Sequence, residues 1–260
     1  DSPCIDPMET LTTPALLATA AFAAGVLNAI AGGGSFLTFP ALVFAGVPPI
    51  VANATSALAV SPGYLGSTLG FKHELLRLPR ERLRQETLLA AAGGVAGALL
   101  LLVTPARVFS GLVPWLLLFA TVLFVAGPWL ARRGHSGDPQ DHPWTRWRPL
   151  GLLAVSVYGG YFNGGLGILL LALYTLTGER HLITANAMKN LNSLVLSLLS
   201  VATFAVAGAI AWGPAVLMMV ATTAGGYAGA HWSRRVPVAL LRGVVVATGL
   251  GMSAVFFLRA

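Results

Sequence analysis

The first stretch that could bind a ligand is a run of three glycines inside a long apolar segment. Gly32, Gly33 and Gly34 interrupt that segment, with Asn28 before them and Ser35 after them. Consecutive glycines weaken a helix by roughly 1 kcal/mol each relative to alanine. We expect the helix to restart at Ser35, whose hydroxyl would cap it. The free N–H groups and the positive end of the helix dipole favour an anion.

The second half of the sequence contains the same device. Asn163, Gly164 and Gly165 also interrupt an apolar run, and a helix is expected to restart near Gly167. Glycine-broken apolar segments at matching positions of two halves indicate a transporter site near the bilayer midplane. An alternative is that the glycines only allow close helix packing.

Polar side chains also begin the apolar span that follows each break. Lys189 is the most informative, because a cation inside an apolar span is costly and is usually functional. It either contacts an anionic substrate or extends its ammonium group to the membrane surface. The candidate substrate-binding residues of this group are Asn53, Thr55, Ser56, Asn186, Lys189, Asn190 and Asn192.

Composition places these residues in a membrane protein. The chain of 260 residues is 56% hydrophobic and 10% charged, against about 25% charged residues in soluble domains. Long apolar runs between short polar loops predict an all-α polytopic protein rather than a barrel. The net charge of +7 is assigned to membrane orientation rather than to nucleic acid, because the basic residues lie in loops.

The acidic residues and the cysteine argue against several chemistries. All nine acids are placed in loops, at loop edges or in the N-terminal tail, which disfavours a carboxylate relay and favours an anion. The single cysteine, Cys4, allows no disulfide framework within one chain. The histidines show no metal-ligand spacing. We therefore expect no cofactor and no metal.

The apolar runs divide into two comparable sets. We expect a tail at residues 1–13, a first membrane repeat at 14–130, a cytoplasmic linker at 131–148 and a second repeat at 149–260. Residues 72–86 are interpreted as a charged loop. The expected apolar segments are 14–31, 36–44, 50–71, 87–103, 112–130, 150–162, 168–177, 182–207, 214–230 and 238–258.

Internal matches support a duplication. Residues 52–54 match 185–187, and residues 93–98 match 225–230. The spaced glycines of the second pair are assigned to helix packing. The basic loop at 72–86 has an uncharged counterpart at 208–213, so the halves are predicted to be inserted in opposite orientations. Each repeat is a glycine-broken helical hairpin followed by about three spanning helices, with the N-terminus extracytoplasmic.

These motifs resemble the TauE/SafE sulfite-exporter family. The first repeat resembles it at 29–35, 40–42, 46–49 and 52–56, and the second at 164–167, Lys189 with Asn192, and 225–230. The resemblance implies transport of sulfite, an organosulfonate or a related small anion across a bacterial inner membrane. Relatives often carry a lysine after the first-repeat threonine, where this chain has Ser56 and Ala57. That departure implies one fewer positive charge.

The leading hypothesis is therefore a multi-pass secondary transporter, an exporter, that works by alternating access. Its partners are a small anion and the lipid bilayer, and a homo-oligomer is compatible with the sequence. The alternatives are an anion channel, an uptake permease for another small anion, a structural membrane protein or an intramembrane enzyme. The enzyme is disfavoured because no nucleophile, base or metal set is found inside the predicted spans.

Overall fold

The computed structural model describes residues 7–30, 33–133, 145–179, 181–232 and 238–259. These residues form helices joined by short connections, and no strand occurs among them. The helices of the first half are α1 Pro7–Ile30, α2 Ser35–Phe44, α3 Pro49–Gly70, α4 Lys72–Leu75, α5 Arg80–Val103 and α6 Ala106–Arg133. Those of the second half are η1 Thr145–Trp147, α7 Arg148–Tyr161, α8 Leu166–Leu176, α9 Leu182–Val206, α10 Trp212–Trp232 and α11 Val238–Arg259.

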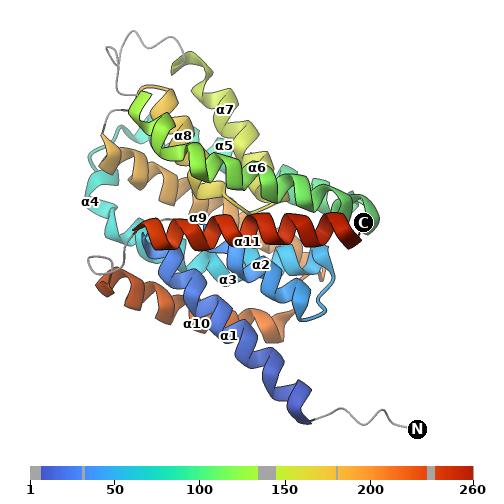
Figure 1. Cartoon of the computed structure of the whole chain (residues 1–260). Helices are drawn as coiled ribbons and strands as arrows, with labels where there is room; N and C mark the ends of the chain where they lie inside the picture. Colours follow the sequence, from blue (N-terminus) through green and yellow to red (C-terminus); the bar gives the residue numbers. More distant parts are fainter. Residues whose placement is uncertain (1–6, 31–32, 134–144, 180, 233–237, 260) are drawn as a thin grey trace.

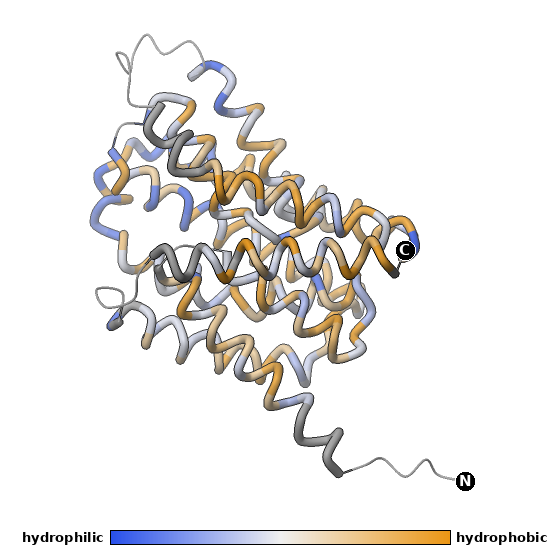
Figure 2. The backbone as a smooth tube through the Cα atoms, viewed as in Figure 1, coloured by the Kyte–Doolittle hydropathy of each residue, from blue (hydrophilic) through white to orange (hydrophobic). Residues whose placement is uncertain are grey.

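The surface of this bundle is suited to lipid. Three described helical stretches are long and apolar enough to cross a membrane: Arg80–Val103, Ala106–Ala126 and Leu182–Val206. Large apolar side chains on them face outward, and Val206 is 92% exposed. Hydrophilic residues gather around α4 and the start of α5 at one end of the bundle (Figure 2). The prediction of an all-α membrane protein is confirmed.

The main helix contacts follow the predicted match between the two halves. The most extensive contact of α1 is with α10, and that of α7 is with α5. The α3–α9 and α6–α11 pairs join the halves (Figure 1). Helices α2 and α8 are too short to span, at about 15 Å for ten residues. Each is the returning arm of a hairpin, after α1 and after α7.

Glycines allow these long contacts, as the sequence indicated. A Cβ atom built on Gly93 would lie 2.5 Å from Cβ of Ser156 on α7, and one on Gly229 would lie 2.7 Å from Cα of Val26 on α1. Gly97 and Gly225 meet the backbone of Val157 and Phe22 in the same way. Small residues at such crossings let helix backbones approach closely.

Replacing Gly93 by leucine tests this packing. The new side chain would enter α7, and overpacking of this kind costs about 1–3 kcal/mol. We expect the Tm in detergent to fall by about 5 °C or more. Gly111→Leu is the control, because no atom lies within 4 Å of its built Cβ. Equal Tm values for the two variants would contradict the packing role.

The predicted segments correspond to the helices, with three differences. Helix α1 begins at Pro7 rather than at residue 14, and α6 begins at Ala106 rather than at residue 112. The prediction of a charged loop over residues 72–86 is wrong, because α4 occupies Lys72–Leu75 and α5 begins at Arg80. Glu86 therefore lies inside a helix and is only 6% exposed, contrary to its assignment to a loop. Its carboxylate finds partners inside the bundle, which offset the cost of burial.

Candidate functional site

The two glycine breaks meet inside the bundle. The hydroxyl of Ser35, at the start of α2, donates to the backbone oxygen of Asn163 at 3.2 Å. Gly33 and Gly165 have φ values of +91° and +78°, a region that side chains other than glycine rarely enter. Both turns thus require glycine. We call the contact between residues 33–35 and 163–165 the tip junction.

Ser35 does not cap its own helix, contrary to the sequence prediction. The N-cap of α2 is Gly34, and no side-chain hydrogen bond caps it. Because the Ser35 hydroxyl is directed to the other tip, it joins the two hairpins instead. Gly32 lies outside the described residues.

The tip junction is closed by aromatic side chains. Phe36 is fully buried, and its ring lies 3.3 Å from a Cβ built on Gly33 and 3.8 Å from one built on Gly165. Phe39 and Phe162 pack edge to face beside it, with ring centroids 5.6 Å apart. Helices α2 and α8 both begin at this apolar enclosure, so the positive ends of their dipoles converge where water is scarce. Most of their first-turn N–H groups donate to backbone oxygens of the tips, as Phe36 does to Gly33 and Ile168 to Gly165.

Asn163 is the unusual residue of the tip junction. Its side chain is only 3% exposed, and neither its amide nitrogen nor its amide oxygen has a hydrogen-bond partner. Each unpaired buried polar group costs about 1–3 kcal/mol. A buried amide left without partners is a group able to bind a ligand that enters the junction.

The predicted residues of α3 have different neighbours. Asn53 donates from its side-chain amide to the Tyr161 backbone oxygen at 3.0 Å, which ties α3 to the end of α7. The hydroxyls of Ser56 and Thr38 lie 2.6 Å apart, next to the first tip. Thr55 instead accepts a hydrogen bond from the Ala211 N–H at 3.0 Å, on the connection before α10. Asn53 and Ser56 therefore adjoin the tip junction, and Thr55 does not.

The predicted residues of α9 are also dispersed. Asn186 donates to the Leu182 backbone oxygen of its own helix at 2.9 Å. Lys189 is half-buried and runs beside the start of α8, with its Cδ atom 3.8 Å from a Cβ built on Gly167. Asn190 is 6% exposed and Asn192 is fully buried. Lys189 is thus the cation that lies near the second tip.

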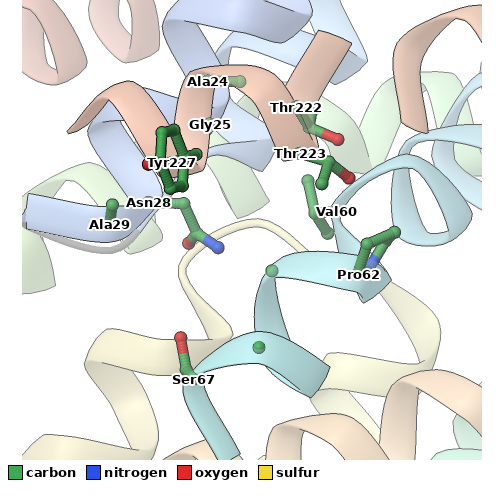
Figure 3. Close-up of a pocket in the computed structure, with 13 residues that line it drawn as sticks. Ala24, Gly25, Asn28, Ala29, Val60, Pro62, Ser67, Thr222, Thr223 and Tyr227 are labelled. Atoms are coloured by element: carbon green, nitrogen blue, oxygen red, sulfur yellow. The ribbon is translucent and has the colours of Figure 1, made fainter. Parts of the chain in front are cut away.

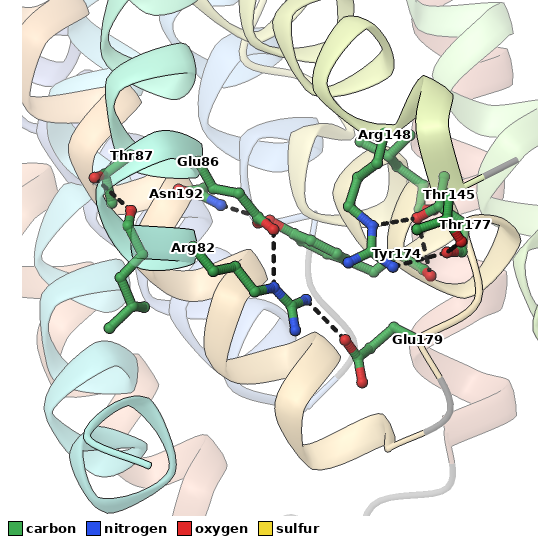
Figure 4. Close-up of polar contacts among 11 residues, drawn as sticks. Arg82, Glu86, Thr87, Thr145, Arg148, Tyr174, Thr177, Glu179 and Asn192 are labelled. Carbon is green, nitrogen blue, oxygen red and sulfur yellow. Dashed lines mark hydrogen bonds and ion pairs between the residues drawn. The ribbon is translucent and has the colours of Figure 1, made fainter. Parts of the chain in front are cut away.

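Asn192 belongs to a polar network that the sequence did not reveal (Figure 4). Its side-chain amide donates at 2.5 Å to the hydroxyl of Tyr174, which donates at 2.6 Å to the carboxylate of Glu86. Arg82 donates to Glu86 at 3.0 Å and to Glu179 at 2.7 Å. We call these five residues the α5–α8–α9 network. The only sequence signal for it was the i, i+4 spacing of Arg82 and Glu86.

Arg148 at the start of α7 secures the same end of the second hairpin. Its guanidinium donates to the Thr177 hydroxyl at 2.9 Å and to the Thr177 backbone oxygen at 2.7 Å. It also lies over the ring of Tyr174, 6.0 Å from the centroid. The open end of the α7–α8 hairpin is therefore held by charged groups of α5 and α7.

Asn28 lies beside the first tip but faces a cavity. Its Cβ atom is 3.3 Å from a Cβ built on Gly34, and its amide nitrogen is 3.0 Å from one built on Gly63. The cavity lies between α1, α3 and α10 and has a volume of about 410 Å³ (Figure 3). We call it the α1–α3–α10 groove. Its polar lining residues are Asn28, Ser67, Thr222, Thr223 and Tyr227.

The comparison with known families agrees with this architecture. The profile described as sulfite exporter TauE/SafE matches residues 17–256. The chain belongs to the TauE/SafE family. The match includes both glycine breaks and both sets of helices, and the resemblance found from the motifs is confirmed.

Individual relatives cover nearly the whole chain. A probable membrane transporter protein of Haemophilus influenzae is 31% identical over 247 residues, which are 92% of each chain. The probable membrane transporter protein YfcA of Escherichia coli K12 is 29% identical over 262 residues, 94% of this chain and 90% of that protein. No solved structure matches the chain. This TauE/SafE protein is a membrane transporter and not an enzyme.

Proposed function

We propose that this TauE/SafE transporter exports a small sulfur-containing anion, such as sulfite or an organosulfonate, and holds it at the tip junction. The observation that carries the proposal is the buried, unpaired amide of Asn163 between the starts of two helices. An anion placed there accepts a hydrogen bond from the amide nitrogen and lies at the positive ends of the α2 and α8 dipoles. The half-buried Lys189 supplies a further donor nearby, while the Ser35 hydroxyl holds the two tips together.

The chemistry of the junction favours an oxyanion over a cation. A sulfite or sulfonate group has three oxygen atoms that accept hydrogen bonds. The Asn163 amide and Lys189 provide donors, and the converging helix starts provide partial positive charge. The buried carboxylate among the described residues, Glu86, already accepts hydrogen bonds from Arg82 and Tyr174. The buried Phe36 and Phe162 limit access of water, which strengthens each electrostatic contact.

The two halves are proposed to lie in the bacterial inner membrane in opposite orientations. Helices α4 and α5 begin at the end of the bundle with the hydrophilic residues (Figure 2), and the positive-inside rule assigns that end to the cytoplasm. The N-terminus of α1 would then be extracytoplasmic. The equivalent contacts of α1 with α10 and of α7 with α5 support rocking of one repeat against the other during alternating access.

Export needs no separate energy source in this scheme. Moving one negative charge out of a negative-inside cell is downhill by about 2.3 kcal/mol at 100 mV. Uptake of the same anion would require a coupling ion. The proposal therefore predicts that flux from the side of α4 responds to the membrane potential.

Flux in proteoliposomes tests the proposal, with sulfite, sulfoacetate, taurine or sulfate inside. We expect saturable efflux and counterflow for a sulfur oxyanion, and a fall of about tenfold or more in Lys189→Ala, because a hydrogen-bonded charge contact contributes about 1.5–3 kcal/mol. Lys72→Ala is the control, since Lys72 is exposed on α4. Unsaturable flux would indicate a channel. Wild-type flux in Lys189→Ala would remove the lysine from the site.

A further inference from the structure

The α1–α3–α10 groove has a polar lining that no substrate contact at the tip junction explains. Its lining side chains include four hydroxyl-bearing residues of α3 and α10, together with the Asn28 amide (Figure 3). No charged side chain is among the described residues that line it. The Thr222 and Thr223 hydroxyls already donate to the backbone oxygens of Ala59 and Met219. The neutral donors left for a small, partly hydrated anion in this cavity of about 410 Å³ are the Asn28 amide and the Ser67 and Tyr227 hydroxyls.

The corresponding region of the other half is closed. By the match of residues 93–98 with 225–230, Gly94 on α5 corresponds to Gly226 on α10. A Cβ built on Gly94 would lie 3.0 Å from the backbone oxygen of Leu196 on α9. A Cβ built on Gly226 would meet only the backbone oxygen of Gly25, at 3.9 Å. Helix α9 therefore packs on α5 at Gly94, whereas α3 leaves a gap beside Gly226. Helices α3 and α10 meet one turn earlier, where the Thr222 hydroxyl donates to the Ala59 backbone oxygen at 2.6 Å.

The side chains at the two places follow the same difference. Counting on from the match of residues 52–54 with 185–187, Gly63 on α3 corresponds to Leu196 on α9. Leu196 is 1% exposed and fills its region, while Gly63 leaves room for the amide of Asn28. The equivalent asparagines differ accordingly: Asn28 borders the groove, and Asn163 is 3% exposed.

We propose that the α1–α3–α10 groove is the cytoplasmic entrance for the anion, and that the Asn28 amide is the first group of the site to bind it. The groove lies toward the C-terminal ends of α3 and α10, and α4 follows α3 directly in the chain. The structure is then the state open to the cytoplasm. This inference rests on the proposed function, because it names the route to the same tip junction.

Alternating access requires a small residue at position 226. In the opposite state α3 closes on α10 at Gly226, as α9 closes on α5 at Gly94 here. A leucine at position 226 fits the present structure, because its Cβ has no neighbour closer than 3.9 Å, but it prevents that closure. The residue is thus needed for transport and not for the fold.

Anion efflux through the Gly226→Leu variant tests whether position 226 must be small. We expect its Tm to equal that of the wild type and its anion efflux to fall at least tenfold. Gly70→Leu is the matched control, since its built Cβ has no atom within 4 Å and Gly70 does not line the groove. Wild-type efflux in a folded Gly226→Leu protein would overturn the inference.

Thiol labelling tests the entrance without relying on flux. Cys4 is the only cysteine in the chain, so Cys4→Ser gives a background for Ser67→Cys and for its repeat equivalent Ser200→Cys. The Ser200 hydroxyl is buried and donates to the Gly94 backbone oxygen at 3.0 Å. A membrane-impermeant methanethiosulfonate carrying a sulfonate group should label Ser67→Cys from the cytoplasmic side, and should not label Ser200→Cys from the outside.

Labelling in the presence of sulfoacetate, and labelling in the Gly226→Leu variant, separate the entrance role of the groove from the identity of the substrate. Sulfoacetate should slow labelling of Ser67→Cys, and Gly226→Leu should not abolish labelling of an adjacent Gly66→Cys. If Ser67→Cys is not labelled from the cytoplasmic side, the groove is not the entrance, whatever the flux shows. If it is labelled while no sulfur oxyanion is transported or protects it, the entrance stands and the proposed substrate class fails.

Discussion

Asn163→Leu is expected to stabilise the transporter and to inactivate it. Leucine has the same branched shape as asparagine, and the Asn163 amide has no hydrogen-bond partner in the ligand-free protein. Removing two unpaired buried groups should raise the free energy of unfolding by about 1–3 kcal/mol. The same amide is the proposed contact of the anion, so loss of a hydrogen bond to a charge should weaken apparent affinity by about 10- to 100-fold.

The measurement pairs a Tm in detergent with the Michaelis constant for efflux. Ser156→Ala is the matched control, because the Ser156 hydroxyl is also buried and unpaired but lies at the α5–α7 contact, away from the tips. Both variants should gain stability, and only Asn163→Leu should lose transport. A normal Michaelis constant in Asn163→Leu would remove Asn163 from the anion site. A lower Tm in that variant would mean that the amide has a structural role.

The sequence predicted the hairpins because glycine leaves a local signature. A run such as residues 32–34 cannot continue a stable helix, so the position of each break follows from composition alone. The contact between the breaks could not be predicted in this way. It depends on how two separate halves pack, and the hydrogen bond from Ser35 to Asn163 joins residues 128 positions apart.

The sequence also could not separate Asn28 from Asn163. The two occupy equivalent places in the repeats, and their different exposure is produced by a third helix in each half. Leu196 fills one region and Gly63 leaves the other open. A local pattern around each asparagine contains no information about that neighbour, so both were predicted as equal members of one site.

The prediction for Glu86 failed for the opposite reason, because the density of charged residues around it indicated a loop. Five basic residues between positions 72 and 84 resemble a solvated loop, and a loop-edge glutamate is ordinarily exposed. The burial of Glu86 is made possible by Tyr174, which lies 88 positions away and donates to its carboxylate. Partners that distant are set by tertiary packing and cannot be found by spacing.

Glu86→Leu is expected to be strongly destabilising, because it removes the acceptor at the centre of the α5–α8–α9 network. Tyr174 is fully buried and would lose its acceptor, and Arg82 would keep only Glu179. Breaking a buried ion pair costs about 3–5 kcal/mol. The Arg82 side chain is 26% exposed and can regain water, so we expect a loss of about 2–3 kcal/mol. The readout is the Tm in detergent.

Two comparisons separate this network from a general effect of removing charge. Glu81→Leu removes an exposed carboxylate one turn earlier on α5 and should change the Tm little. Tyr174→Phe should cost less by itself, and the double variant with Glu86→Leu should cost clearly less than the sum of the two, because the second change removes the donor left unpaired by the first. Strict additivity would show that the Tyr174 hydroxyl and Glu86 are energetically independent.

The network also makes the two halves unequal, since the counterparts of Glu86 and Asn192 are Met218 and Ala59. Among the described residues, only the α7–α8 hairpin is therefore held by such a polar network, and the buried Asn163 belongs to the same hairpin. A stable α7–α8 hairpin and an open groove beside α1 are consistent features of a single state. Glu86→Leu should consequently loosen the second hairpin and increase thiol labelling of an Asn163→Cys variant. Unchanged labelling would show that the network stabilises the fold without controlling access to the second tip.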